Sequence, residues 1–98
     1  MKLKLLTAAQ TDVASAIAYY DSEKPDLGAD FATEVRKTVE RILQYPKAWA
    51  TVSERIRRCQ VNRFPYSVFY SLKEDVVVVV AVLHNHREPR TWQTRLEE

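Results

Sequence analysis

Hydrophobic and polar residues alternate at the start of the chain and then recur at helical spacing. The alternation from Lys2 to Leu6 predicts a short strand with its leucines on one face. Thr7, with Gln10 three residues later, matches a capping box, in which the first side chain caps a helix. We therefore expect a helix from about Ala8 to Ser22.

Two apolar stripes in the first half of the chain predict a pair of helices. Each stripe repeats at intervals of three or four residues, which places its members on one side of a helix. The stripes are Val13, Ile17 and Tyr20, and then Phe31, Val35, Val39 and Ile42. Pro25 predicts a turn between the helices, and Pro46 ends the second one, which we expect from Leu27 to about Tyr45. The two stripes indicate a helical hairpin that covers an apolar surface.

The second half of the chain supplies that surface as strands. We expect strands at Glu54–Val61, Tyr66–Leu72 and Val76–Leu83, with a hairpin turn at Lys73–Asp75. The last strand is almost entirely β-branched, which is typical of a strand buried on both faces. The order β-α-α-β-β-β predicts one α+β domain over residues 1–98, with the helical hairpin packed on a mostly antiparallel four-stranded sheet.

Cysteine content and the lengths of the apolar runs indicate the compartment. Cys59 is the only cysteine, so no disulfide can form within the chain, and we expect a cytoplasmic protein. The first residues lack the apolar core of a signal peptide. The longest apolar run is Val76–Leu83, far shorter than the roughly 20 residues that a membrane helix needs. We expect no membrane partner.

Charge is distributed unevenly along the chain. Residues 1–54 carry seven Lys and Arg against eight Asp and Glu, whereas residues 55–96 carry eight against three. Seven of those eight basic residues are arginines, whose planar guanidinium groups suit phosphate and carboxylate partners. The excess predicts either an anionic partner for the second half or an ordinary solvated basic surface.

The arginine-rich strand is the first candidate binding segment. Alternation along a strand places Arg55, Arg57 and Arg63 on one side, unless a bulge intervenes, and places Arg58 and Gln60 on the other. One interpretation is a cationic face that contacts a polyanion or an acidic peptide. The other is an edge strand that its charges protect from aggregation, and the two are compatible.

A polar segment that follows the valine strand contains the candidate catalytic residues. His84 and His86 lie two residues apart, but a His pair alone is a weak metal signal and no third ligand stands out, so we predict no metal. A histidine can shuttle a proton near neutral pH, and Arg87 can stabilise developing negative charge, which is the minimum equipment for RNA cleavage. The alternative is a set of polar residues at an exposed strand end. No motif indicates a cofactor.

The C-terminal tail adds Arg90 and Trp92 as candidate binding residues. Trp92 either docks on the edge of the sheet and orders the tail, or it lies exposed as an anchor for a partner. The sequence leaves both interpretations open.

In this order, the motifs resemble the RelE/ParE toxin family over nearly the whole chain. The resemblance is carried by Ala18-Tyr19-Tyr20, Leu27-Gly28, Arg57-Arg58, Arg63-Phe64-Pro65-Tyr66, Phe69-Tyr70 and His84–Arg87, followed by Pro89, Arg90 and Trp92. It implies a small cytoplasmic toxin of a type II toxin–antitoxin (plasmid stabilisation) system. The resemblance also implies a cognate antitoxin, whose C-terminal segment wraps the toxin. Members of the ParE type act on DNA gyrase, whereas members of the RelE type cleave mRNA in the ribosome.

Comparison with the family residue by residue favours the ParE-like branch. Arg87 matches a catalytic arginine of the RelE-like nucleases, and Arg58 matches one of their two catalytic lysines. Gln60 and Ser67 stand where those nucleases have further basic residues. This incomplete set implies a toxin that inhibits growth by binding a target such as DNA gyrase.

The alternative is a RelE-like, ribosome-dependent mRNA endonuclease. It would use Arg58, Arg87 and one of the two histidines for catalysis. Arg57 and Arg63 would then hold phosphates of the mRNA.

Overall fold

The structure, a computed structural model, describes residues 1–86 and 91–95 of the chain. Its elements are β1 (Lys2–Leu5), α1 (Thr7–Glu23), α2 (Leu27–Gln44), β2 (Arg57–Gln60), β3 (Tyr66–Lys73), β4 (Val76–His84) and α3 (Thr91–Arg95). The predicted order β-α-α-β-β-β is confirmed, and the short helix α3 follows it. In the described part of the chain, no helix is long and apolar enough to cross a membrane.

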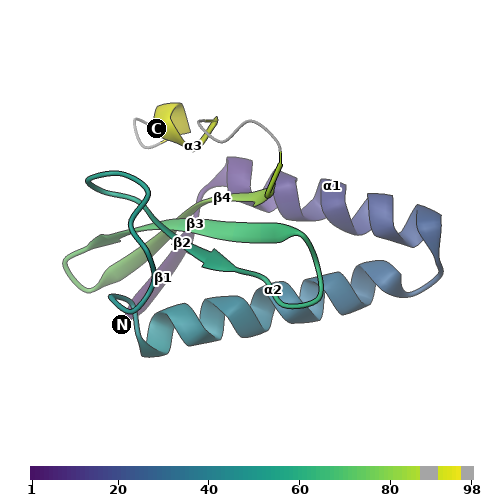
Figure 1. Ribbon diagram of the computed structural model, residues 1–98, viewed down its shortest axis with the longest axis horizontal. Coiled ribbons are helices and arrows are strands. Elements are labelled where there is room, and N and C mark those ends of the chain that lie inside the picture. The colour runs from purple at the N-terminus through teal and green to yellow at the C-terminus, as the bar shows by residue number, and fades with distance from the viewer. Residues whose placement is uncertain (87–90, 96–98) are drawn as a thin grey trace.

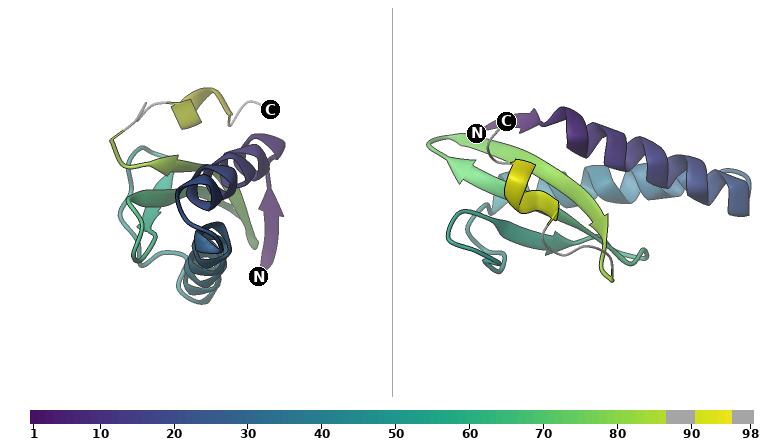
Figure 2. Two further views of the ribbon diagram at one scale, coloured as in Figure 1. Left: turned by 90° about the vertical axis from the view of Figure 1, so that its right-hand side faces the viewer. Right: turned by 90° about the horizontal axis from the view of Figure 1, so that it is seen from above.

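The four strands form one sheet in the order β1-β4-β3-β2. β1 runs parallel to β4, while the β3–β4 and β2–β3 pairs are antiparallel, so the prediction of a mostly antiparallel sheet is confirmed. The hairpin of α1 and α2 lies on one face of this sheet, here called the helix-covered face (Figure 1). Helix α3 lies over the opposite face, here called the open face (Figure 2).

The core under the helical hairpin is built from the predicted stripes. Phe31 on α2 is fully buried, and its ring lies 4.9–5.4 Å from the rings of Tyr20, Phe64 and Tyr66. These tilted and edge-to-face contacts bring α1, α2 and the start of β3 together. The remaining stripe residues either belong to this cluster or pack against it, which confirms both helical stripes.

One glycine allows α1 and α2 to approach closely. A Cβ atom at Gly28 would lie 2.6 Å from the Ile17 carbonyl oxygen and 2.6 Å from Asp21 Oδ1, which is too close for any side chain to fit. The Gly28 N–H instead donates a 2.7 Å hydrogen bond to Asp21 Oδ1. The absence of a side chain therefore sets the separation of the two helices at this end of the hairpin.

Strand β4 is buried on both faces along most of its length, as predicted. Its partner Phe69 pairs with Ala81 and Tyr70 pairs with Val79, so Val80 is an extra residue that forms a β-bulge. The bulge directs both Val80 and Ala81 to the open face, where they pack with Trp92 of α3. After the bulge, alternation resumes in the opposite phase.

Side chains from two helices replace a strand along part of the edge of β4. β1 pairs only with Val76 to Val79. Beyond this point Asp12 of α1 accepts a 3.0 Å hydrogen bond from the Val82 N–H, and Arg95 of α3 donates a 3.1 Å hydrogen bond to the Val80 carbonyl. The two side chains also form an ion pair with one another at 2.5 Å. This arrangement covers an edge that would otherwise be open to another chain.

Two local predictions are wrong. Thr7 does not cap the first helix, because Leu6 occupies the N-cap without a side-chain hydrogen bond and Gln10 Nε2 donates instead to the Leu5 carbonyl at 3.2 Å. The strand expected at Glu54–Val61 is confined to Arg57–Gln60. The residues before it form a tight loop, in which the Val52 N–H donates to the Ile56 carbonyl at 2.8 Å.

Candidate functional site

A hydrogen-bonded network on the open face connects β2, β3 and the end of β4. Arg58 Nε donates to Ser67 Oγ at 2.9 Å, and Arg58 Nη2 donates to Asn85 Oδ1 at 3.2 Å. Ser67 Oγ in turn donates to the same Asn85 oxygen at 2.7 Å. Strand pairing produces this arrangement, because Arg58 lies opposite Phe69 in the ladder and Ser67 lies opposite Leu83, next to the turn that carries Asn85.

The other end of the network is fixed by backbone groups. Asn85 Nδ2 donates to Gln60 Oε1 at 3.0 Å, and Gln60 Nε2 donates to the carbonyls of Val61 and Phe64 at 3.1 and 3.2 Å. The Asn85 N–H donates to the Pro65 carbonyl at 2.8 Å. These contacts assign the orientation of both amides and hold the guanidinium of Arg58 in one position.

The network presents a single positive charge to solvent. Arg58 is exposed, and within residues 1–86 and 91–95 it makes no ion pair. Beside it lies a hollow of about 430 Å³ lined by Arg41, Trp49, Ala50, Arg58, Gln60 and Asn62. A guanidinium with unused donors next to such a hollow can bind a carboxylate, a phosphate or a backbone carbonyl of a partner.

The structure places His84 on the other side of the sheet from Arg58. His84 pairs with Tyr66, and the two rings lie 5.4 Å apart on the helix-covered face. Both line a hollow of about 390 Å³ against α1. The bulge at Val80 is the physical reason, since regular alternation along β4 would have placed His84 on the face of Arg58.

The two histidines contact each other. The His86 N–H donates a 3.2 Å hydrogen bond to His84 Nδ1, and the two rings are 5.7 Å apart. Because Nδ1 acts as an acceptor, a neutral His84 carries its proton on Nε2. In the described residues, no group of three or more His, Cys, Asp and Glu is placed to hold a metal ion.

Two arginines expected on one face with Arg55 have separate structural roles. Arg57 Nη1 donates to the carbonyls of Lys47 and Trp49 at 3.1 and 2.7 Å and so fastens the loop after α2 to β2. Arg63 lies in the turn after β2, outside the strand, with a left-handed φ of 71°. The predicted alignment of the three arginines is therefore wrong, because the strand ends before Arg63.

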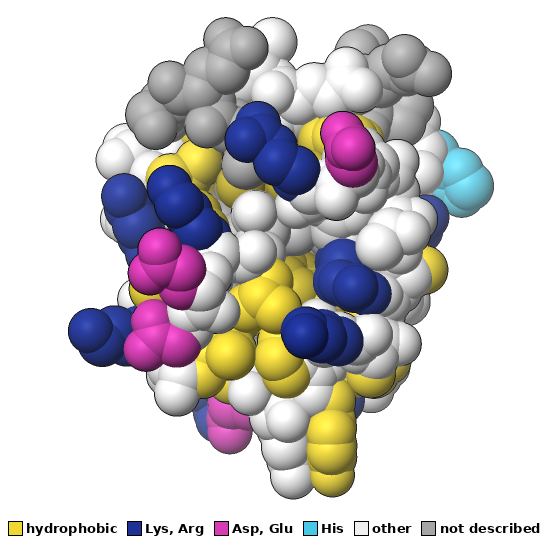
Figure 3. Space-filling view, turned by 90° about the vertical axis from the view of Figure 1, so that its left-hand side faces the viewer, with side chains coloured by type: hydrophobic (Ala, Val, Ile, Leu, Met, Phe, Trp, Pro, Cys, Tyr) yellow, Lys and Arg dark blue, Asp and Glu magenta, His cyan; other side chains and the backbone are white. Residues whose placement is uncertain are grey.

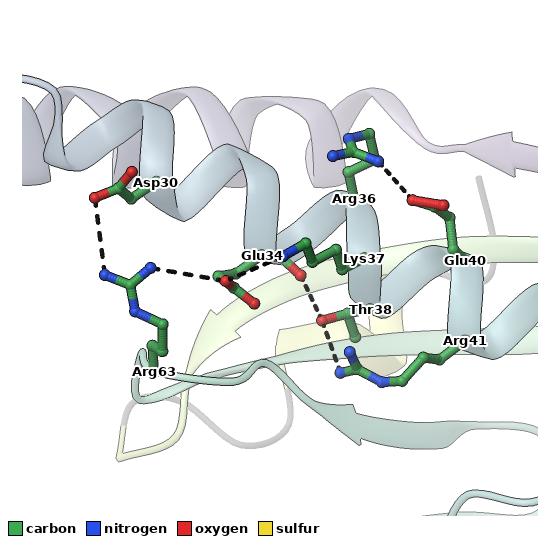
Figure 4. Close-up of polar contacts among 8 residues, drawn as sticks. All are labelled: Asp30, Glu34, Arg36, Lys37, Thr38, Glu40, Arg41 and Arg63. Carbon is green, nitrogen blue, oxygen red and sulfur yellow. Dashed lines mark hydrogen bonds and ion pairs between the residues drawn. The ribbon is translucent and has the colours of Figure 1, made fainter.

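Arg63 is held against acidic residues of α2 (Figure 4). Its guanidinium lies 3.8 Å from Asp30 Oδ2 and 3.8 Å from Glu34 Oε2. Glu34 is mostly buried and also lies 3.9 Å from Lys37 Nζ. These contacts anchor the β2–β3 turn to the helix, so part of the charge of Arg63 is already balanced within the chain.

The remaining predicted residues divide into buried, exposed and undescribed positions. Trp92 is 5% exposed and stacks on Phe69 with ring centroids 6.1 Å apart. It therefore docks on the open face of the sheet, whereas the two interpretations of the sequence placed it on the edge of the sheet or exposed. Arg55 is exposed in the loop before β2. Arg87 and Arg90 lie outside the described residues, so their assignment to catalysis or binding stays a prediction.

Buried tyrosine and cysteine side chains near the sheet are held in their neutral forms. Burial raises the pKa of Tyr70 to about 12, and the nearby Arg57 opposes the shift only in part. Burial also raises the pKa of the Cys59 thiol, despite the proximity of Arg41. Cys59 is therefore a packing residue rather than a nucleophile.

Sequence reasoning missed Asn85, which joins the three strands of the network. Its neighbours in the sequence drew attention instead, because histidine and arginine have obvious chemistry. The missing information was the register, which brings Asn85, Ser67 and Arg58 together across three strands. An asparagine directly after a long buried strand was the available signal.

Known proteins are similar to this chain in sequence and in fold. A family model described as "ParE toxin of type II toxin-antitoxin system, parDE" matches residues 3–89. Toxin ParE2 of Mycobacterium tuberculosis, in strains CDC 1551 / Oshkosh and ATCC 25618 / H37Rv, is 24% identical over 96 residues, which cover 97% of this chain and 91% of the relative. The solved structure "Chromosomal ParDE TA system from P. aeruginosa" superimposes with a TM-score of 0.76 at 17% identity, covering 86% of this chain and 95% of that chain.

Proposed function

The chain belongs to the ParE toxin family of type II toxin–antitoxin systems, and from this premise we propose that it inhibits growth by binding a macromolecular target such as DNA gyrase. The predicted resemblance to RelE/ParE toxins is confirmed, with the ParE-like branch favoured. The observation that carries the proposal is the composition of the network around Arg58. Its other members are neutral, namely Ser67, Asn85 and Gln60.

A neutral network suits binding better than proton transfer. General acid–base catalysis needs a group that titrates near neutral pH within hydrogen-bond reach of the reacting atom. The amides and the hydroxyl around Arg58 do not titrate in that range. The imidazole of His84 is not part of this network, because it lies on the helix-covered face with Tyr66. Arg58 and the hollow beside it are therefore better suited to hold a carbonyl or an anionic group of a partner.

We further propose a cytoplasmic cognate antitoxin as the neutralising partner. Membership of a toxin–antitoxin family implies a toxin and an antitoxin that act as a pair. The family resemblance implies that a C-terminal segment of this antitoxin wraps the toxin. By covering Arg58, such a segment would block contact with the target.

The test measures DNA supercoiling by gyrase in the presence of the purified chain. We expect inhibition by the wild type and a loss of potency of about 10-fold or more for Arg58→Ala, because truncated arginines at interface centres are costly. Arg36→Ala is the matched control, since Arg36 is an exposed arginine on α2 that pairs with Glu40. It should keep wild-type potency.

A parallel arm follows mRNA in a translating extract. Intact mRNA together with inhibited gyrase is the expected result. Gyrase that supercoils normally at saturating toxin would refute the gyrase proposal. Cleavage of ribosome-bound mRNA that disappears in Arg58→Ala would establish the RelE-like endonuclease instead.

A further inference from the structure

A second basic surface lies on the open face, at the end of the sheet away from Arg58. Lys4 and Ser71 flank Val78 in the ladder, because β1 and β3 both pair with β4 at this residue. One row further along, Lys2 and Lys73 flank Val76 in the same way. Strand order alone thus brings residues from the two halves of the chain into adjacent rows.

Two connected hollows mark this surface. The smaller, of about 210 Å³, is lined by Lys4, Leu6, Arg55, Ser71, Lys73, Val78 and Arg95. The larger, of about 410 Å³, shares Arg55, Ser71 and Lys73 with it and is lined further by residues of the loop before β2. We call the surface formed by Lys2, Lys4, Arg55 and Lys73 the basic end.

The cations of the basic end are available to a partner. Among the residues that the structure describes, Lys2, Lys4, Arg55 and Lys73 form no ion pair. Arg95 differs, since its charge is balanced by Asp12. Glu54 lines the larger hollow, and among the described residues no acidic side chain lines the smaller one. Figure 3 shows Lys and Arg side chains on this end of the molecule, with hydrophobic side chains exposed between them and acidic side chains at several places among them.

We propose that the basic end binds an acidic peptide segment that also carries aliphatic side chains. Carboxylates would contact Lys4 and Lys73, and an aliphatic side chain would cover Val78. On the proposed function, the segment belongs to the antitoxin. The site is separate from Arg58, so it adds a second contact to that partner.

The spacing of the cations fits an extended peptide. Lys2 and Lys73 lie on strands two apart, which separates their backbones by about 10 Å. A peptide lying along β4 between them can direct carboxylates to both sides. Alternate residues of an extended peptide lie roughly 7 Å apart. This spacing equals that between Val76 and Val78 along β4.

The lining distinguishes a peptide from a nucleic acid. Single-stranded nucleic acid is typically bound by cations interleaved with aromatic side chains on which bases stack. No aromatic side chain lines either hollow, within the described ranges. Val76 and Val78 are instead partly exposed between the cations. A phosphate backbone would make no favourable contact with this apolar floor. An aliphatic side chain would gain by covering it.

The test uses fluorescence anisotropy with a labelled peptide of alternating Glu and Leu, about 10 residues long, as the probe. We expect saturable binding that weakens with salt, and a loss of about 10-fold or more in the double variant Lys4→Glu, Lys73→Glu. The matched control is Lys24→Glu, Lys47→Glu, which changes net charge equally at exposed lysines outside both hollows. The control should change affinity by less than about twofold.

Other outcomes would overturn the site. Equal weakening in the two double variants would mean that net charge alone attracts the peptide. Tighter binding of a thymidine oligonucleotide of equal charge would assign the surface to nucleic acid. If charge reversal disturbs folding, the double variant Lys4→Gln, Lys73→Gln replaces it. Circular dichroism checks that this variant keeps the native fold. Because the assay contains no gyrase, its failure is distinguishable from failure of the proposed function.

Discussion

The two faces of the sheet are made by alternate residues of the same strands, yet they differ in what holds them together. The helix-covered face is closed by aromatic and aliphatic packing around Phe31. On the open face, the buried apolar cluster is the patch under Trp92. The Arg58 network lies at one end of this face, and the basic end, with its cations around partly exposed valines, lies at the other. On the proposals made above, stability and recognition are assigned to opposite sides of a single layer.

The largest loss of stability is expected for a substitution on the helix-covered face. Phe31→Ala removes a fully buried ring that contacts three other rings, and we expect it to lower the free energy of unfolding by about 3–5 kcal/mol. Urea denaturation followed by circular dichroism measures the change. Tyr19→Ala, at an exposed ring on α1, should cost far less. Similar losses in both variants would contradict a core centred on Phe31.

An intermediate effect is expected where the two faces meet at the edge of β4. Asp12→Ala removes the acceptor for the Val82 N–H and leaves Arg95 without its counter-ion. We expect a loss of about 2–3 kcal/mol, because a mostly buried charge loses its counter-ion. Hydrogen exchange should accelerate at Val82. Asp30→Ala, which removes an exposed carboxylate, is the control, and unchanged exchange in Asp12→Ala would show that the edge is protected by other means.

The smallest effect concerns a single hydrogen bond beneath the sheet. Tyr70 donates a 2.6 Å hydrogen bond to the Pro46 carbonyl, and Tyr70→Phe should cost about 1 kcal/mol at neutral pH. The raised pKa of Tyr70, about 12 against an ordinary value of 10.0, means that folding favours the protonated phenol. Its contribution is therefore complete below pH 10 and is lost as the pH rises towards 12. Between these pH values, the free energy of unfolding should fall more steeply with pH for the wild type than for Tyr70→Phe. An equal pH dependence in the two proteins would contradict the assignment.

The contrast between the faces also explains what the sequence could predict. The stripes of α1 and α2 and the valine strand follow from periodicity, because burial repeats with the geometry of each element. The basic end could not be predicted in this way. Lys4 and Lys73 are 69 positions apart in the sequence and meet only because β1 inserts beside β4. Asn85 escaped notice for the same reason, since its partners lie on other strands.

One error has a more local origin. Alternation is expected to align Arg63 with Arg55 and Arg57, but Arg63 adopts a left-handed φ in the turn after β2. The bulge in β4, where Val80 is the extra residue, is a further feature that the sequence did not predict. When the residues on both sides of a bulge are apolar, the pattern of apolar and polar residues does not reveal the bulge.

That extra residue sets the surroundings of every side chain that follows it in the strand. In a strand without the bulge, the side chains from Val82 onward would lie on the opposite faces, although their identities were unchanged. The imidazole of His84 would then leave Tyr66 and lie on the same face as the guanidinium of Arg58. One inserted position therefore decides which chemistry the end of the sheet presents on each side.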